Sequence, residues 1–335
     1  TMSNLLSIVI PSHNRTDLLL SAIESIVSDD SFSNDCSICI SDNSLTDETL
    51  HEIQKRYSDD SRVHYRRSLD SPSLDENINT AVNMSDSEYV WIFGDDDLMV
   101  KDSLTDILNI LRKHRHGLLI VNSQTFSDST IIECNRNCLP CNKEYDIADN
   151  DEFMIDMAGY LTYAPCIIVK KEDWVNSFNP VNVGTFFAHL NAVMEIKLSS
   201  KAYYIATPSI RMRLHSQTWT EHHFKIWNIY YPKIIWGAEG YSDKAKLQVV
   251  KKNPLQSLFS ILSSRAYGRY DFSIFKDTVV NSTGCNLLYK IMHLFIVMTP
   301  TILLRNLYYL LIKSGIKKRS ANFSPDLALA LLRKT

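Results

Sequence analysis

Short apolar runs alternate with segments of helical periodicity over the first third of the chain. Runs of this kind, rich in β-branched residues and closed by polar or proline residues, are typical of buried parallel strands, and apolar positions three and four apart indicate helices. We expect strands at residues 5–11, 36–40, 63–65 and 89–93, and helices at residues 16–28, 50–57, 75–84 and 103–114. This alternation predicts an α/β fold with a doubly wound, mostly parallel sheet and helices on both faces.

The remaining elements are less regular. A strand is expected at residues 118–123, a loop-rich stretch at 126–149, a helix at 152–160, a strand at 165–169, a helix at 186–198 and a short strand at 203–206. From about residue 220 the chain changes to aromatic, basic helices. We therefore predict a doubly wound α/β domain over residues 2–218 and a helical, basic C-terminal region over residues 219–335.

Three polar clusters follow the predicted strands, at residues 11–15, 41–47 and 95–97. In a doubly wound sheet, ligands bind outside the carboxyl ends of the strands. The three clusters are therefore expected to meet at one edge and form a site.

Glycine is scarce, with nine in the chain and the first at Gly94. Phosphate-binding loops and dinucleotide fingerprints require glycine directly after the first strand, so both are excluded there. The net charge of −3 argues against a nucleic-acid binder. It conceals a gradient of −14 over residues 1–110, −2 over 111–210 and +13 over 211–335, which indicates different partners for the two ends.

The most apolar segment, residues 285–312, has a core of eleven residues at 294–304 interrupted by Pro300. A bilayer span needs about 20 apolar residues, so we expect no span. Lys313, Lys317, Lys318 and Arg319 follow and suit an anionic membrane surface. A buried helix pair with a solvated basic tail is an equally good interpretation.

Asp95, Asp96 and Asp97 stand directly after the strand at 89–93. Adjacent carboxylates repel one another unless a cation is present, and hard oxygen ligands suit Mg²⁺ or Mn²⁺. A solvated acidic turn is the alternative, but the position at the ligand-binding edge favours a metal. Asp42 ends the second strand, where its carboxylate can accept hydrogen bonds from a base or ribose, or cap its own turn.

Three ordered motifs resemble family 2 glycosyltransferases of the GT-A fold. They are SIVIPSHNR at residues 7–15, ISDNSLTD at 40–47 and WIFGDDDLMVKDSL at 91–104. The resemblance is strongest to the O-antigen branch that includes abequosyltransferases, and it extends to about residue 218. It implies transfer of a sugar from a nucleotide diphosphate sugar, assisted by Mg²⁺ or Mn²⁺, to a lipid-linked O-antigen or other surface-polysaccharide acceptor.

The resemblance also assigns site residues. The nucleotide-contacting set matches Pro11, His13, Asn14, Arg15, Asp42, Asn77 and Asp95, with Arg211 and Arg213 facing the pyrophosphate; the metal set matches Asp96, Asp97 and His215. Two features depart from the family pattern. Gly94 replaces the usual first acid of the DxD motif, and a Pro72-containing segment replaces a glycine turn before Asn77.

An inverting transfer needs a general base on the acceptor hydroxyl. The family places an acid near residues 184–194, where this chain has His189, which becomes the candidate base although a histidine on an apolar helix is by default a core residue. Asp151, Asp156 and Glu195 are the reserves. Trp219 is a candidate acceptor contact.

Cys134, Cys138 and Cys141 have the spacing of an iron–sulfur signature, but no fourth ligand accompanies them, so free thiols are expected. An odd total of seven cysteines fits a reducing compartment. The expected location is cytoplasmic, peripheral on the inner face of a bacterial membrane. A nucleotidyltransferase is a weaker alternative, since those enzymes use a glycine- and arginine-rich first loop, and a non-catalytic nucleotide-sugar-binding protein is another.

Overall fold

The computed structural model describes residues 4–137, 139–214, 222–282 and 285–313. It divides into two units, which we describe separately. The first contains residues 1–217 and 234–249, and the second contains residues 218–233 and 250–335. The domain boundary at residue 218 stays a prediction, because residues 215–221 lie outside the described chain and residues 234–249 return to the first unit.

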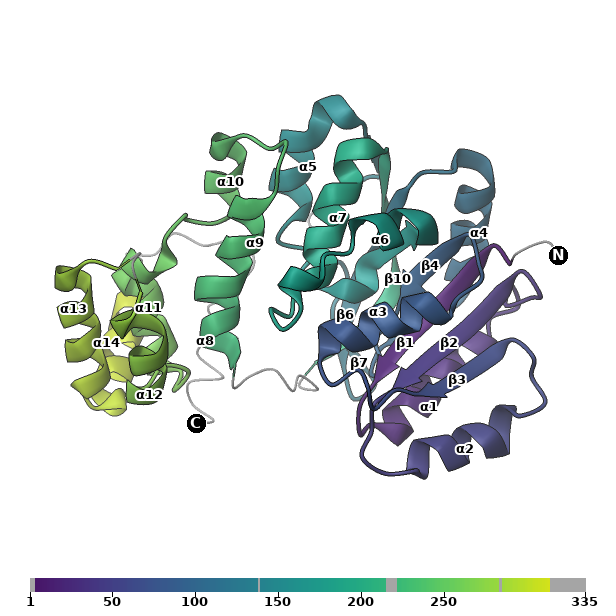
Figure 1. The fold of residues 1–335 in the computed structure, drawn as a ribbon, viewed down its shortest axis with the longest axis horizontal. Coiled ribbons are helices and arrows are strands. Elements are labelled where there is room, and N and C mark those ends of the chain that lie inside the picture. Colours follow the sequence, from purple (N-terminus) through teal and green to yellow (C-terminus); the bar gives the residue numbers. More distant parts are fainter. Residues whose placement is uncertain (1–3, 138, 215–221, 283–284, 314–335) are drawn as a thin grey trace. The chain divides into compact units, whose positions relative to one another are not determined.

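The first unit is built on a ten-stranded sheet (Figure 1). Its strands are β1 (Leu6–Ser12), β2 (Cys36–Asp42), β3 (Val63–Arg67), β4 (Tyr89–Ile92), β5 (Leu98–Met99), β6 (Leu118–Ser127), β7 (Thr130–Glu133), β8 (Lys143–Tyr145), β9 (Ile167–Lys170) and β10 (Ala202–Arg213). The order along the sheet is β3-β2-β1-β4-β9-β6-β10-β5, with β7 paired to β6 and β8 to β10.

The long strand pairs are parallel. β1 pairs with β2 and β4, β2 with β3, and β6 with β10, all in the same direction. Their carboxyl ends therefore share one edge, at which Ser12 lies beside Asp42 and Asp42 beside Arg67. This edge brings together the polar segments that the sequence places after the strands.

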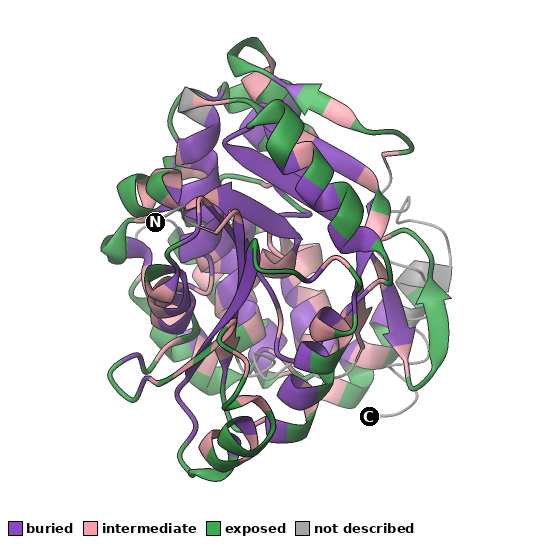
Figure 2. Ribbon diagram, turned by 90° about the vertical axis from the view of Figure 1, so that its right-hand side faces the viewer, coloured by how far each residue is buried: buried purple, intermediate pink, exposed green. Residues whose placement is uncertain are grey.

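Helices cover both faces of this sheet. They are α1 (Thr16–Val27), α2 (Glu48–Tyr57), α3 (Leu74–Met84), α4 (Ser103–His114), α5 (Asn150–Met157), α6 (Lys171–Ser177) and α7 (Ala188–Ser199). A further helix of the unit, α10 (Asp243–Val249), packs on α5. Ile8 and Ile10 of β1 join a core cluster with residues of α1 and α4. The buried side chains of α3 lie outside that cluster although α3 contacts β1 and β2, so α3 packs on the opposite face. Figure 2 shows the buried sheet between these layers.

The predicted α/β class and most predicted elements are confirmed. β5 and α6 have no counterpart among the predicted elements, and there are three further differences. β9 runs antiparallel between β4 and β6. β10 is twelve residues long, so Arg211 and Arg213 belong to a strand. The stretch expected to be loop-rich contains β7 and β8, which are short edge strands of four and three residues that leave little periodic signal.

The second unit is helical. It contains α8 (His223–Lys225), the first residues of α9 (Tyr231–Gly237), α11 (Leu258–Ala266), α12 (Phe272–Phe275), α13 (Leu287–Met298) and α14 (Thr301–Lys313). In the part of the chain that the structure describes, no single helix is long and apolar enough to cross a membrane; α13 and residues 301–308 meet that test only together, as a pair bent by 105°.

Candidate active site

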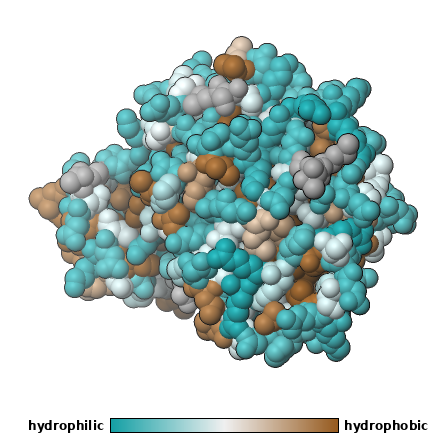
Figure 3. Space-filling model, turned by 45° about the vertical axis from the view of Figure 1, so that its right-hand side comes forward, coloured by the Kyte–Doolittle hydropathy of each residue, from teal (hydrophilic) through white to brown (hydrophobic). Residues whose placement is uncertain are grey.

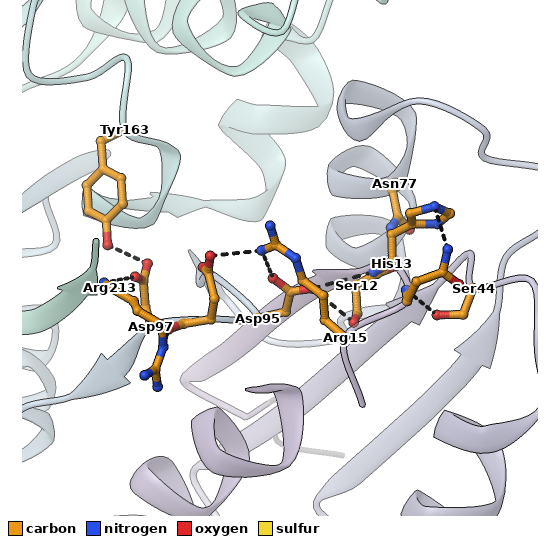
Figure 4. Close-up of polar contacts among 11 residues, drawn as sticks. Ser12, His13, Arg15, Ser44, Asn77, Asp95, Asp97, Tyr163 and Arg213 are labelled. Atoms are coloured by element: carbon orange, nitrogen blue, oxygen red, sulfur yellow. Dashed lines mark hydrogen bonds and ion pairs between the residues drawn. The ribbon is translucent and has the colours of Figure 1, made fainter. Parts of the chain in front are cut away.

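The loop after β1 is hydrogen-bonded to the turn formed by Asp95, Asp96 and Asp97 after β4, which we call the acidic turn. Asp95 accepts hydrogen bonds from Ser12 Oγ at 3.1 Å, from the His13 backbone N–H at 3.4 Å and from Arg15 Nη1 at 3.0 Å (Figure 4). Burial raises the pKa of Asp95 to about 6, against the opposing effect of the Arg15 charge. The sequence places these segments 80 residues apart, and the pairing of β1 with β4 brings them together.

Arg15 stands between two carboxylates. Its Nη1 donates to Asp95 Oδ1 at 3.0 Å and to Asp96 Oδ2 at 2.8 Å. Two carboxylate oxygens from adjacent residues therefore converge on a single cationic nitrogen. The site carries its own counter-charge, which offsets the repulsion between the two carboxylates.

Asp97 is directed away from this pair. Its carboxylate accepts hydrogen bonds from the Tyr163 hydroxyl and from the Arg213 backbone N–H, the latter at 3.1 Å (Figure 4). Burial, followed by the charge of Asp96, raises the pKa of Asp97 to about 8. Arg213 Nε also donates to the Asp96 carbonyl at 3.0 Å, so β10 is bonded to the acidic turn through both groups.

Gly94 has a steric reason to be glycine. A Cβ at this position would lie 2.5 Å from Asp97 Oδ2 and 3.2 Å from Asp96 Oδ1. The Asp97 carboxylate cannot yield easily, because it is buried and held by Tyr163 and Arg213. An acid at position 94, as the related motif has, is incompatible with this arrangement of the turn.

Asp42 is fully buried and held by its own neighbours. It accepts hydrogen bonds from the Ser44 backbone N–H at 3.0 Å, from the Ser44 hydroxyl and from Tyr65 Oη at 2.8 Å. The turn interpretation of Asp42 is therefore correct. Its two oxygens have further acceptor capacity, so a role in base recognition stays a proposal.

The loops after β1 and β2 are bonded to each other. His13 Nδ1 lies 2.9 Å from Asn43 Oδ1. Asn14 accepts a hydrogen bond from the Leu45 N–H at 3.0 Å, and its own backbone N–H donates to Ser44 Oγ at 2.7 Å. Both His13 and Asn14 are exposed, whereas Pro11 is half-buried within β1. The exposed pair is thus presented at the edge on a loop fixed at both ends.

Asn77 joins the two strands from α3. Its Nδ2 donates to the Ser12 carbonyl at 3.1 Å, and its Oδ1 accepts from Ser41 Oγ at 2.6 Å. Its side chain is buried, and these bonds hold the ends of β1 and β2 in register.

Asp75, two residues earlier on α3, binds a distant loop. Its carboxylate accepts backbone N–H bonds from Gly184 at 2.9 Å, Phe186 at 3.0 Å and Ala188 at 3.2 Å. Phe186 has a φ of 66°, a conformation that a bulky side chain rarely adopts. The buried carboxylate thus holds a strained segment in place immediately before α7.

We predict that Asp75→Ala lowers the free energy of unfolding by about 2–3 kcal/mol, because three backbone N–H groups lose their acceptor together. Denaturant unfolding followed by tryptophan fluorescence measures the change. The exposed Asp86→Ala is the matched control and is expected to stay within about 0.5 kcal/mol of wild type. Equal stabilities of the two variants would contradict the assignment.

His189 lies in the first turn of α7 with 3 % of its surface exposed. Nε2 is 3.1 Å from the Leu161 carbonyl oxygen, so this nitrogen carries the proton and Nδ1 carries the lone pair. Within the described chain Nδ1 has no hydrogen-bond partner. Burial lowers the pKa of His189 to about 4, so the ring is neutral at pH 7.

The reserve acids have other contacts. Asp151 accepts a hydrogen bond from the Ser242 N–H at 2.7 Å, and Asp156 accepts from Lys143 Nζ and Tyr145 Oη, both at 2.8 Å. Glu195 is partly exposed on α7. Arg211 on β10 has a buried Nε without a hydrogen-bond partner in the part of the chain described. His215 and Trp219 lie outside the described residues.

Sequence reasoning missed Tyr65, Asp75 and Tyr163 as members of the site, and it placed Ser12 in the polar cluster at residues 11–15 without giving it a role. Tyr65 occupies a strand position, where nothing separates it from ordinary sheet residues. Tyr163 and Asp75 act on partners 66 to 113 residues away. Local patterns carry no signal for contacts of that length.

The donor chemistry of the acidic turn fits a hard divalent cation. The oxygens of Asp95 and Asp96 already converge on a cationic nitrogen, and carboxylates are preferred ligands of Mg²⁺ and Mn²⁺. No group of three or more His, Cys, Asp or Glu side chains among the described residues is arranged to hold a metal alone. Substrate phosphates would have to complete the coordination, as is usual for Mg²⁺. Cys134 and Cys141 are exposed free thiols, and Cys138 is outside the described chain.

Residues 7–154 match the family model described as glycosyl transferase family 2. Abequosyltransferase RfbV of Salmonella typhimurium is 26% identical over 306 residues, which cover 84% of this chain and 90% of that protein. The Campylobacter jejuni GalNAc(5)-diNAcBac-PP-undecaprenol beta-1,3-glucosyltransferase is 30% identical over 104 residues, 31% of this chain and 33% of that protein.

Solved structures share the fold. Staphylococcus aureus TarS 1-349 in complex with UDP-GlcNAc has a TM-score of 0.61 at 12% identity, covering 94% of this chain and 93% of that one. The mannosyltransferase PcManGT of Pyrobaculum calidifontis, in complex with GDP-Man and Mn²⁺, has a TM-score of 0.54 at 13% identity, covering 95% and 87%.

The doubly wound sheet with an acidic turn at its ligand-binding edge defines a glycosyltransferase with a GT-A-like fold. Residues 7–154 are similar to glycosyl transferase family 2 through the match to its model, and an abequosyltransferase is among the relatives of the chain.

Proposed function

We propose that the protein transfers a sugar from a nucleotide diphosphate sugar to a lipid-linked O-antigen or similar surface-polysaccharide acceptor. The observation that carries the proposal is the convergence of Arg15, Asp95 and Asp96 at the edge where β1 and β2 end in polar loops. The relatives support it, since they include an abequosyltransferase and a glucosyltransferase whose name contains a PP-undecaprenol carrier.

The donor is proposed to bind along this edge. The nucleoside faces Pro11, His13, Asn14 and Asp42, while Asn77 supports the strands beneath. The diphosphate faces Arg15, with Arg211 and Arg213 as further cationic partners. Arginine suits this task because its planar donors match phosphate oxygens.

The residues proposed to hold Mg²⁺ or Mn²⁺ are Asp96 with Asp95 or Asp97; when bound, the cation would neutralise charge on the leaving diphosphate. Asp96 is the best placed of the three, since its side chain is 18% exposed while Asp97 is directed to Tyr163 and Arg213. Arg15 would exchange its carboxylate partners for phosphate oxygens as the donor arrives. His215 lies outside the described residues, and it is included among the proposed metal ligands on the basis of the sequence alone.

His189 is the proposed general base. Its ring is neutral at pH 7 with an unpaired Nδ1, which is the state that proton removal requires. It binds the Leu161 carbonyl, two residues before Tyr163, whose hydroxyl binds Asp97. Asp75 also fixes the segment that leads into this helix. These contacts connect His189 to the acidic turn through the segment that contains Leu161 and Tyr163. Because Nδ1 is buried here, proton removal requires this nitrogen to be opened to the acceptor hydroxyl.

A panel of UDP-, dTDP-, CDP- and GDP-sugars with and without Mn²⁺ tests the donor site. A ligand present at 100 times its Kd adds about 2.7 kcal/mol to the free energy of unfolding. This corresponds to a rise of about 5–10 °C in the melting temperature of the unit that binds the ligand. We expect one base class to give such a shift, larger with Mn²⁺. The matching nucleoside monophosphate is the control and is expected to give less. Absence of any shift would refute the donor-site proposal.

The site of action is proposed to be the cytoplasmic face of a bacterial membrane, where the enzyme would be peripheral. The positive charge of residues 211–335 supports an anionic membrane partner, and the negative charge of the catalytic part argues against nucleic acid.

A further inference from the structure

An uncovered apolar face lies on the two C-terminal helices of the second unit. α13 and α14 are separated by Thr299 and Pro300, and each turns large hydrophobic side chains to the exterior. Phe295 is 70% exposed and Met298 is 69% exposed. Leu287 and Leu288 on α13 and Ile302 and Leu310 on α14 are also at least 60% exposed. Figure 3 shows hydrophobic side chains, in brown, on the surface of this unit.

The opposite face of both helices is firmly packed. Ile296, Val297 and Leu304 are buried in the core of the second unit. His293 is fully buried between Tyr270 Oη at 2.6 Å and the Leu255 carbonyl at 2.7 Å. The helices are therefore apolar on the inner face, which is held by the core, and on the outer face, which the described chain leaves exposed. Large exposed apolar patches mark protein or membrane interaction sites.

The charge of this segment indicates which partner covers the face. Between Asp277 and Asp326 the sequence contains no acidic residue, and it contains six basic ones: Lys290, Arg305, Lys313, Lys317, Lys318 and Arg319. Apolar side chains flanked by cations without acids match the boundary between the headgroups and acyl chains of an anionic bilayer. A protein partner would not require this exclusion of negative charge.

The helices are too short to cross that bilayer. Neither helix is long enough on its own, since α13 has 12 residues and α14 has 13 against the roughly 20 needed for a span, and the two meet at a bend of 105° instead of forming one straight helix. We propose that the α13–α14 pair docks its outer face into one leaflet of an anionic membrane without spanning it. This inference deepens the proposed function and rests on it, since it supplies the element that would hold the enzyme at a lipid-linked acceptor.

Vesicle flotation of the full chain tests the proposal, with vesicles of phosphatidylcholine alone or mixed with phosphatidylglycerol. We expect the wild type to float with the mixed vesicles and largely to remain behind with phosphatidylcholine alone. Phe295→Ser with Met298→Ser is expected to lower partitioning onto mixed vesicles at least tenfold. Both side chains are exposed, so the exchange leaves the core of the unit intact.

The matched control is Val181→Ser with Leu247→Ser, two apolar residues of the first unit that are 74% and 58% exposed. It is expected to float like the wild type. Equal flotation of both double variants would overturn the proposal. So would sedimentation without lipid that shows a dimer dissociated by the Phe295/Met298 exchange, because the face would then be covered by a second copy.

The same variants separate this inference from the function on which it rests. The nucleotide-sugar thermal shift is expected to be unchanged in the Phe295/Met298 variant. Loss of flotation with an intact shift supports membrane docking and leaves the donor site standing. A wild type that binds donor but never floats refutes membrane docking alone, and a wild type that floats but binds no donor refutes the proposed function alone.

Discussion

Asp96→Asn is expected to lower the transferase rate by about 100- to 1,000-fold, the usual effect of removing one group that stabilises charge in a transition state. The exchange keeps the size of the side chain but removes the charge that opposes Arg15 and would bind a divalent cation. Sugar transfer to a lipid-linked acceptor, or donor hydrolysis where no acceptor is at hand, measures the change. The Mn²⁺-dependent part of the nucleotide-sugar thermal shift is expected to disappear in parallel.

Asp102→Asn is the control for this experiment. Asp102 is an exposed acid six residues further on, its φ of 66° suits asparagine, and its side chain makes no capping bond. Its rate is expected to equal that of the wild type. An Asp96→Asn enzyme whose transferase rate is within tenfold of the wild-type rate would contradict catalysis through this carboxylate. Measurable transfer by the wild type would exclude the alternative that the protein only binds nucleotide sugars.

His189→Gln is expected to lower the transferase rate by about 100- to 10,000-fold, the range that general bases contribute. The glutamine amide can still donate to the Leu161 carbonyl, so the helix keeps its attachment, but it cannot accept the proton. Donor affinity is expected to be unchanged. Since the pKa of His189 is lowered to about 4, its base form persists on acidification, and the wild-type rate should lose this contribution only as the pH approaches 4.

His116→Gln provides the matched control. His116 is also buried, at 4% exposure, and its Nε2 lies 2.6 Å from Glu144. It stands two residues before β6 begins, at the amino end of that strand and so opposite the edge that carries the acidic turn. We expect a rate close to that of the wild type. If His189→Gln transfers sugar at the wild-type rate, the base lies elsewhere and Asp156 and Glu195 become the residues to exchange.

The sequence was sufficient for the alternation of strands and helices over the first third of the chain and for the acidic turn. Each of these depends on local periodicity, as in β1 and α1, or on residue type at a strand end, as in the three aspartates after β4. The antiparallel direction of β9 could not be predicted, because a buried strand has the same composition in either direction.

The different contacts of the three aspartates also could not be predicted from the sequence. Adjacent in sequence, they receive different partners from the fold: Asp95 binds the β1 loop, Asp96 binds Arg15, and Asp97 binds Tyr163 and β10. The resulting pKa values of Asp95 and Asp97, about 6 and about 8, depend on burial that only the tertiary structure provides. The need for glycine at position 94 was equally unpredictable. The carboxylate atoms of Asp96 and Asp97 that would clash with a side chain there are brought close only by the folded turn.

One turn of α3 serves two parts of the site. Asn77 binds the ends of β1 and β2, and Asp75 binds the segment that leads to His189. Because Asn77 and Asp75 lie two residues apart on the same helix, the helical geometry of α3 fixes the distance between the two attachments. The spacing between the donor side and the α7 side is therefore set by a single rigid element.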